Sequence, residues 1–107
     1  MPRPRLRRRV GFKPDVIFFK PAGIPKSELE EVILSVDEFE AVRLKDYEDL
    51  DQKQASEKMN ISQPTFHRNL LSARKKIADA LTNGKSIRIE GGNFEFKLPL
   101  FKGRRRN

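Results

Sequence analysis

The chain contains no cysteine and no tryptophan, and it has one histidine among its 107 residues. Without cysteine there is no disulfide, no thiolate nucleophile and no cysteine-ligated zinc. A single histidine argues against a metal or acid–base centre. No apolar run reaches the roughly 20 residues that span a bilayer, and no apolar segment of a secretory signal follows the first arginines. We therefore expect a cytoplasmic protein with no metal, cofactor, enzymatic activity or membrane partner.

Positive charge is what the chain has in excess, and the charges are sorted along the sequence. Lys and Arg number 23 against 15 Asp and Glu, which gives +8 at pH 7. Residues 1–20 and 62–107 are mostly basic, whereas residues 28–51 hold ten acids and two bases. The commonest partner of such excess positive charge is a phosphate backbone, and an anionic membrane surface is the main alternative. We expect a nucleic-acid partner, with the acidic stretch as a solvated outer face.

A chain of this length has room for one domain and its tails. Residues 1–14 combine three prolines with a run of arginines, which is typical of a flexible basic arm. Residues 100–107 end in three arginines and an asparagine and are predicted to form a basic tail. The single domain is therefore expected over residues 15–99.

Two helices are predicted in the middle of the chain. Ser35 and Glu38 form a capping box in front of a helix that continues to about Asp46. Asp51 is an N-cap for a shorter helix over Gln52–Met59.

A third, longer helix is predicted over residues 63–82. Ser62 is its N-cap, Pro64 lies in its first turn, where the missing N–H costs little, and Gly84 follows its end. Apolar residues recur every three or four positions and are expected in the core: Phe66, Leu70, Ala73, Ile77 and Leu81.

Short strands are expected on both sides of the helices. Residues 32–34 leave two interpretations open, because Leu29, Val32, Ile33 and Val36 have helical spacing. The β-branched Val32 and Ile33, just before the Ser35 cap, favour a short strand, which we expect. Residues 86–90 and 94–98 alternate apolar and polar side chains around a glycine-rich turn, which predicts a β-hairpin. The predicted fold is mainly α and of winged-helix-like size, with a helix-turn-helix core over about 35–83 and a C-terminal hairpin over about 86–98.

The second and third predicted helices carry the pattern of a helix-turn-helix. Small side chains at Ala55 and Ser56 allow the two helices to approach closely, and Met59 and Ile61 fill the corner. Asn60 tolerates the left-handed backbone that ends a helix. In this motif the second helix enters the major groove of DNA.

The outer N-terminal face of the third helix holds the candidate DNA contacts. Arginine pairs with guanine and glutamine with adenine in bidentate fashion, while a helix N-terminus and basic side chains suit phosphates. The candidates are Ser62, Gln63, Thr65, His67, Arg68, Arg74, Lys75 and Lys76. The arm could enter the minor groove or add nonspecific affinity. Its candidates are Arg3, Arg5, Arg7, Arg8 and Arg9.

Residues 50–62 resemble the helix-turn-helix of sigma-factor region four, and this likeness extends from Leu34 to Ile77. A wider resemblance, over nearly the whole chain, is to an uncharacterised prokaryotic protein family, number 0251. The segments that carry it are residues 3–5, 19–25, 37–46 and 88–92. That family is described as predicted DNA-binding, so the resemblance implies a bacterial or archaeal origin and a DNA-binding role, without a target. Asn60 replaces the usual turn glycine, and Ser56 replaces a more usual alanine and adds a hydroxyl that needs a partner.

Together these patterns predict a sequence-preferring duplex-DNA-binding protein, a nucleoid-associated transcriptional regulator that reads the major groove with residues 63–82. Two alternatives stay open. One is an RNA- or ribosome-binding protein; the other is a protein-interaction module that docks on RNA polymerase or another regulator. The long third helix and the hairpin could also form a homodimer face, which would predict a palindromic site.

Overall fold

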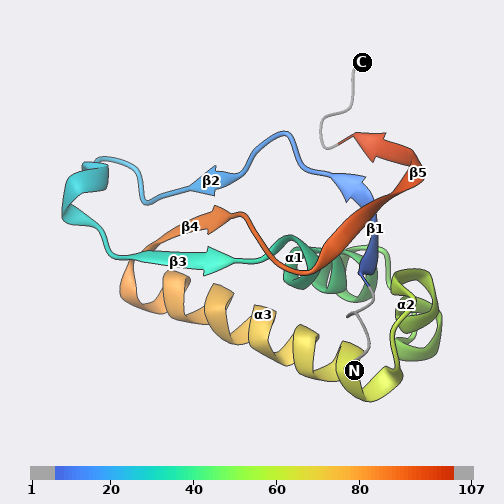
Figure 1. Ribbon diagram of the computed structural model, residues 1–107. Helices are drawn as coiled ribbons and strands as arrows, with labels where there is room; N and C mark the ends of the chain where they lie inside the picture. The colour runs from blue at the N-terminus through green and yellow to red at the C-terminus, as the bar shows by residue number, and fades with distance from the viewer. Residues whose placement is uncertain (1–6, 103–107) are drawn as a thin grey trace, which may run out of the picture.

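The computed structural model describes residues 7–102. This part of the chain contains three α-helices and five strands, arranged as a small α/β domain (Figure 1). Its elements are, in order, β1 (Arg8–Lys13), β2 (Phe18–Phe19), the 3₁₀ turn η1 (Lys26–Glu28), β3 (Glu31–Leu34), α1 (Val36–Val42), the π-helical turn η2 (Arg43–Tyr47), α2 (Gln52–Met59), α3 (Gln63–Asn83), β4 (Ser86–Ile89) and β5 (Phe94–Lys102). Among these residues no helix is long and apolar enough to cross a bilayer.

The strands form two separate sheets. In the first, of order β2-β4-β3, the central strand β4 runs antiparallel to β2 and parallel to β3. In the second, β1 pairs in parallel with β5. The three-stranded sheet lies over the C-terminal half of α3, whereas the two-stranded sheet lies at the other end, beside α1 and α2 (Figure 1).

The predicted hairpin of residues 86–98 is wrong. Both segments are strands, but β4 and β5 belong to different sheets and do not pair with each other. The glycines between them do not form a hairpin turn and instead contact the start of α1. There the Val36 amide donates a hydrogen bond to the Gly91 carbonyl at 2.9 Å. Alternation of apolar and polar residues indicates a strand and leaves its partner open.

The predicted flexible arm extended too far along the chain. Strand β1 begins at Arg8, and Val10 is fully buried with Leu34, Ala73 and Ile89. A buried valine, a partner strand, the Arg8–Asp37 ion pair and the hydrogen bond from the Gly11 amide to Glu40 together hold a segment whose composition is mostly basic. Strand β5 likewise continues through residues assigned to the basic tail. The rest of the predicted arm, residues 1–6, and of the tail, residues 103–107, lie outside the described residues.

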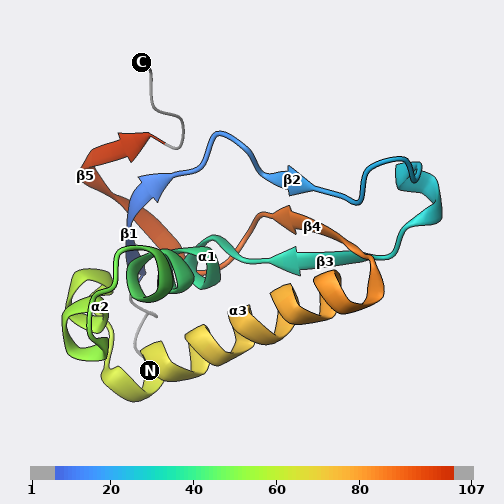
Figure 2. The ribbon, with the colours of Figure 1, turned by 180° about the vertical axis from the view of Figure 1, so that it is seen from behind.

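The three predicted helices and the strand before α1 are confirmed. The first helix continues beyond Val42 as η2, so the helical segment reaches Tyr47. Helix α2 has the predicted bounds, and α3 ends one residue after the predicted end, at Asn83. Figure 2 shows from behind how α1 and α2 pack against the N-terminal half of α3.

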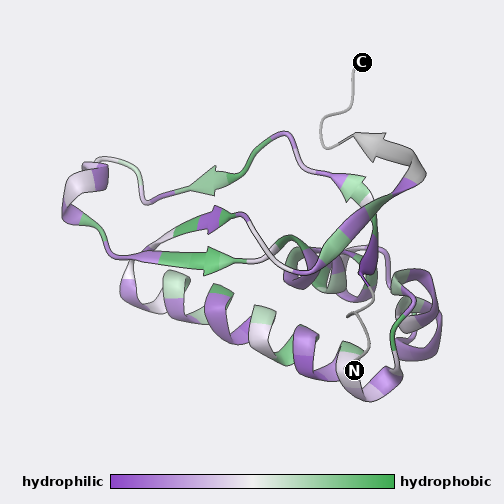
Figure 3. Ribbon diagram, viewed as in Figure 1, coloured by the Kyte–Doolittle hydropathy of each residue, from purple (hydrophilic) through white to green (hydrophobic). Residues whose placement is uncertain are grey.

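The inner face of α3 is apolar and its outer face is mostly hydrophilic (Figure 3). Phe66, Leu70 and Ala73 are buried as predicted. Leu81 was expected in the core, but its side chain is 77% exposed. Ala80 takes the buried position in the last turns, so the periodicity predicted the helix correctly and assigned Leu81 to the wrong face.

Candidate nucleic-acid interface

Local hydrogen bonds fix the backbone that joins α2 to α3. The Asp51 carboxylate accepts from the Gln54 amide at 2.7 Å and starts α2. Asn60 ends that helix in the left-handed conformation, with φ of 57°. The Ser62 hydroxyl then accepts from the Thr65 amide at 3.2 Å and starts α3. The predicted caps and turn are thus confirmed, and α3 leaves α2 through a short, defined turn.

Buried side chains hold the two helices together. Ala55 and Met59 of α2 and Phe66 of α3 are fully buried in one cluster. The Ser56 hydroxyl, also buried, donates to the Lys53 carbonyl at 3.0 Å. This bond satisfies the hydroxyl that the sequence left in need of a partner. Helix α2 therefore braces the first half of α3 with apolar contacts.

The first turns of α3 present polar side chains to solvent. Gln63, His67 and Arg68 are exposed, and Thr65 is half-buried. The Thr65 hydroxyl accepts from Ser62 at 2.9 Å and from the Arg68 guanidinium at 3.2 Å. This face offers amide, imidazole and guanidinium donors of the kind that bind base edges and phosphates.

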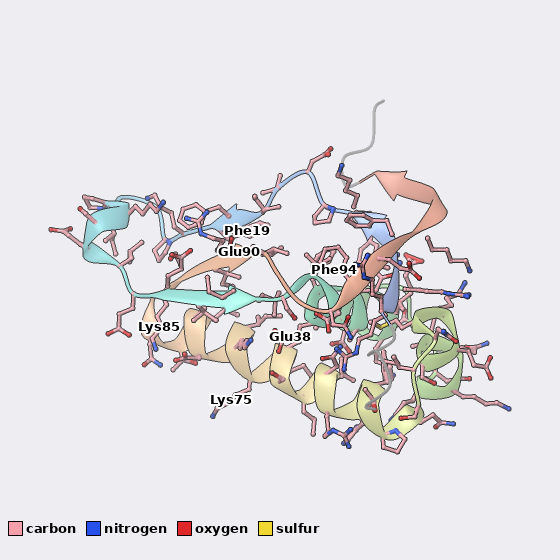
Figure 4. The ribbon with its side chains drawn as sticks, viewed as in Figure 1. Phe19, Glu38, Lys75, Lys85, Glu90 and Phe94 are labelled. Atoms are coloured by element: carbon pink, nitrogen blue, oxygen red, sulfur yellow. The ribbon has the colours of Figure 1, made fainter. Side chains whose placement is uncertain are left out.

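Two of the predicted phosphate-binding residues differ in orientation. Lys75 is exposed and points away from the body of the molecule (Figure 4). Arg74 is exposed too, but its guanidinium donates twice to Asp46, at 2.6 and 3.0 Å. This hydrogen bond lowers the pKa of Asp46 and raises that of Arg74. Lys75 therefore presents its charge to solvent, whereas the guanidinium of Arg74 is bound to Asp46.

Lys76 faces α1 and not the outer surface. Its ammonium lies 2.7 Å from the Glu38 carboxylate, which also accepts from the Ser72 hydroxyl and from the Ser35 amide. Burial raises the pKa of Glu38, but the hydrogen bonds from Lys76, Ser72 and Ser35 outweigh it and hold the pKa below its ordinary value of 4.5. Glu38 lies between α1 and α3 (Figure 4), so this pair joins the two helices. Lys76 thus has an internal partner in place of a free charge.

The acidic stretch is not a uniformly solvated face, as the sequence had indicated. Asp37, Glu38 and Glu40 are all buried. Each faces a cation within 3 Å: Arg8 at 2.9 Å, Lys76 at 2.7 Å and Arg43 at 2.7 Å, respectively. Counting acids and bases along the sequence could not reveal these ion pairs, because the count does not show which face of α1 each acid occupies. For Asp37 and Glu38 the available signal was their place in the first turn after the Ser35 cap, where carboxylates complement the helix dipole. Glu40 lies beyond that turn.

The start of β1 lies next to the first half of α3. Arg8, predicted as an arm contact, pairs with Asp37, whose carboxylate also accepts from Asn69 of α3 at 3.5 Å. Arg7 and Arg9, on either side, are exposed. The other predicted arm contacts, Arg3 and Arg5, lie outside the described residues. The start of β1, which carries these two exposed arginines, lies at the same end of the molecule as the start of α3 (Figures 1 and 2). Within the described part, no three His, Asp or Glu side chains gather into a cation site.

The depressed pKa of Glu38 predicts a loss of stability in acid. Folding favours its ionised form, so its contribution to the free energy of unfolding is present above its ordinary pKa of 4.5 and is lost as the pH falls through the lower folded-state pKa. In Glu38→Gln we expect this part of the acid sensitivity to disappear, as measured by urea unfolding at a series of pH values. Glu57→Gln, exposed on α2, is the control. A Glu38→Gln protein as acid-sensitive as the wild type would contradict the assignment.

Comparison with known proteins identifies the family. The family described as "Protein of unknown function DUF134" matches residues 1–97. A UPF0251 protein of Moorella thermoacetica is 55% identical over 105 residues, which cover 98% of this chain and 70% of that protein. The chain belongs to the UPF0251 family. UPF0251 proteins of Dehalococcoides mccartyi and Caldanaerobacter subterraneus are 61% and 59% identical over 95 residues, covering 89% of this chain and 81% and 80% of theirs. No solved structure matches the chain.

Proposed function

We propose that this UPF0251 chain is a DNA-binding protein whose α2–α3 pair is a helix-turn-helix. In this proposal the first half of α3 enters the major groove and reads base edges with Gln63, His67 and Arg68. The observation that carries the proposal is the exposed donor face of a capped helix that a second short helix braces from behind. Regulation of transcription is the role that such sequence-preferring binding best fits.

Cations around this face support phosphate contacts beside the base contacts. Lys75, Arg7 and Arg9 are exposed, and the start of β1, which carries the two arginines, lies at the same end of the molecule as the start of α3. Arg74 can also serve, since an exposed ion pair such as the one with Asp46 contributes at most about 1 kcal/mol and a phosphate can replace it. Lys76 is the weakest candidate because leaving Glu38 would strand a buried carboxylate. The Ser62 hydroxyl and the Gln63 amide at the α3 N-terminus suit one further phosphate, whereas Pro64 has no N–H and the Thr65 amide already donates to Ser62.

Substitution of Arg68 tests the base contact. A duplex selected from a random pool at about 0.15 M salt, where surface charges are substantially screened, serves as the ligand in fluorescence-anisotropy titrations. We expect Arg68→Ala to weaken binding roughly 5- to 150-fold and to relax the preference at one base pair. Lys75→Ala should instead weaken binding to all duplexes alike and lower the slope of log K against log salt by about 0.9.

Lys26→Ala is the matched control because it removes the same charge at the opposite end of the molecule (Figure 1). Unchanged affinity and base preference in both Arg68→Ala and Gln63→Ala would overturn the proposed groove reading. Equal affinity for structured RNA would favour the RNA-binding alternative. Salt-insensitive binding to RNA polymerase, without affinity for DNA, would favour the docking alternative.

A further inference from the structure

Exposed apolar side chains gather at the end of the molecule opposite the N-terminus of α3. In the described part of the chain, eight large apolar side chains are exposed. Tyr47 and Leu71 lie elsewhere, and Ile33 lies on the opposite face of the three-stranded sheet from Phe19, because Ile33 pairs with Arg88 whereas Phe19 pairs with Ile87. The other five are Val16, Ile17, Phe19, Ile24 and Leu81. We call the end of the molecule that holds them the distal face, made of residues 15–31 and 79–90.

A groove of about 380 Å³ opens on the distal face between β2 and the C-terminal end of α3. Phe19 forms one wall, Ala80 and Leu81 form the other, and Ile87 of β4 lines the groove between them. Phe19 and Ile87 are neighbours across the strands, which makes their side of the groove continuous. The side chain of Leu81 is 77% exposed and that of Phe19 is 51% exposed. The apolar groove thus lies next to the exposed side chain of Leu81.

The charge of the distal face favours a second copy of this chain as the occupant of the groove. Its residues hold six acids and four bases, a net charge of −2, so the total of +8 leaves +10 on the rest of the chain. Two copies that met through the rest of the surface would set like charges against each other. Through the distal face they meet without this repulsion, because Lys85 at the groove is already paired within its own copy, with Asp79 at 3.0 Å and with Glu30 at 3.4 Å. Nucleic acid would find no excess of positive charge here.

We propose that the chain forms a twofold homodimer through the distal face, with Leu81 of each copy seated against Phe19 and Ile87 of the other. A twofold contact is isologous, which means that both copies use the same surface. Leu81 of the first copy therefore enters the groove of the second, and Leu81 of the second enters the groove of the first. Neither Phe19 nor Leu81 belongs to the proposed DNA-reading face. The dimer therefore extends beyond the proposed function and does not rest on it.

This dimer would direct the two DNA-reading ends away from the contact. Helix α3 has 21 residues, and at 1.5 Å per residue it spans about 30 Å. Its N-terminus thus lies that far from the distal face of its own copy. Half-sites about one or two DNA turns apart are within the reach of such a pair.

The oligomeric state, measured without DNA, tests the proposal. Sedimentation equilibrium of the full chain from micromolar to millimolar concentration should give twice the chain mass of 12.4 kDa. Leu81→Asp should give the monomer mass. Leu71→Asp, at the other exposed leucine of α3, should still give the dimer. Circular dichroism verifies the fold of each variant, and Leu81→Ala, which adds no charge, should weaken the dimer at least tenfold if Leu81→Asp does not fold.

Three outcomes would overturn the dimer: a wild-type chain that stays monomeric throughout, a folded Leu81 variant as dimeric as the wild type, or dissociation by Leu71→Asp alone. None of them affects the Arg68→Ala titration, so failure of the dimer and failure of DNA binding are separable. Monomeric Leu81→Asp should keep its affinity for a single half-site.

Discussion

Glu40→Ala is expected to lower the free energy of unfolding by about 3–5 kcal/mol, because removal of one partner of a buried ion pair leaves the other charge uncompensated. The Glu40 side chain is 2% exposed and accepts two hydrogen bonds from Arg43, at 2.7 and 2.9 Å. It also accepts from the Gly11 amide of β1 at 2.8 Å. The alanine variant therefore strands a nearly buried guanidinium and a backbone donor, and it removes a link between β1 and α1.

Urea unfolding followed by circular dichroism, at one protein concentration, measures this loss. Glu57→Ala makes the same change at an exposed position of α2 and should shift the free energy of unfolding by no more than about 0.5 kcal/mol. Glu40→Gln keeps an acceptor for the Gly11 amide and should fall between the two. If Glu40→Ala unfolds like Glu57→Ala, the buried pair does not hold β1 against α1.

Gly92→Ala should destabilise the protein by about 3–5 kcal/mol through strain and overlap together. Gly92 has a φ of +105°, which L side chains rarely adopt. A Cβ atom there would lie 2.2 Å from Oδ1 of Asp37 and 2.9 Å from Cβ of Ser35. Asp37 is 3% exposed and is held by Arg8, so its carboxylate has little room to move.

The neighbouring glycine supplies the control for this substitution. Gly91 also has a positive φ, of +76°, but no atom lies within 4 Å of a Cβ built on it. Gly91→Ala should therefore show backbone strain alone, about 1–2 kcal/mol. Thermal and urea unfolding of the two variants measure the difference. Equal losses would mean that Asp37 moves aside, and that Gly92 is needed for its φ and not for its contact.

The helices could be predicted from the sequence because their signals are local. Ser35, Asp51 and Ser62 each start a helix through a hydrogen bond to an amide three residues ahead. Asn60 ends α2 through its own backbone conformation. The partners of the strands could not be predicted, because β4 and β5 alternate as hairpin strands do and yet pair with β2, β3 and β1. Strand pairing depends on contacts distant in sequence, which alternation does not encode.

The exposed part of the candidate site was also predictable, whereas its internal ion pairs were not. The 3.6-residue period of α3 is enough to place Gln63 and Arg68 on the outer face. The partners of Arg74 and Lys76, in contrast, lie 28 and 38 residues away, on a helical segment whose orientation the sequence does not give. The prediction that Leu81 lies in the core was wrong for a related reason. The apolar period of a helix shows that one of its faces is buried, but it does not show which residue of the last turns contacts the sheet.

The parallel pairing of β1 with β5 has a consequence for synthesis on the ribosome. Of the described strands, β1 emerges from the exit tunnel first and its partner emerges last. Helices α2 and α3 make local contacts and can fold while translation continues, but the contact between β1 and β5 has to wait for most of the chain. Until then Val10 has no partner strand, and the arginines of β1 stay free beside an RNA-rich ribosome. The β1–β5 sheet can therefore form only after β5 has left the exit tunnel.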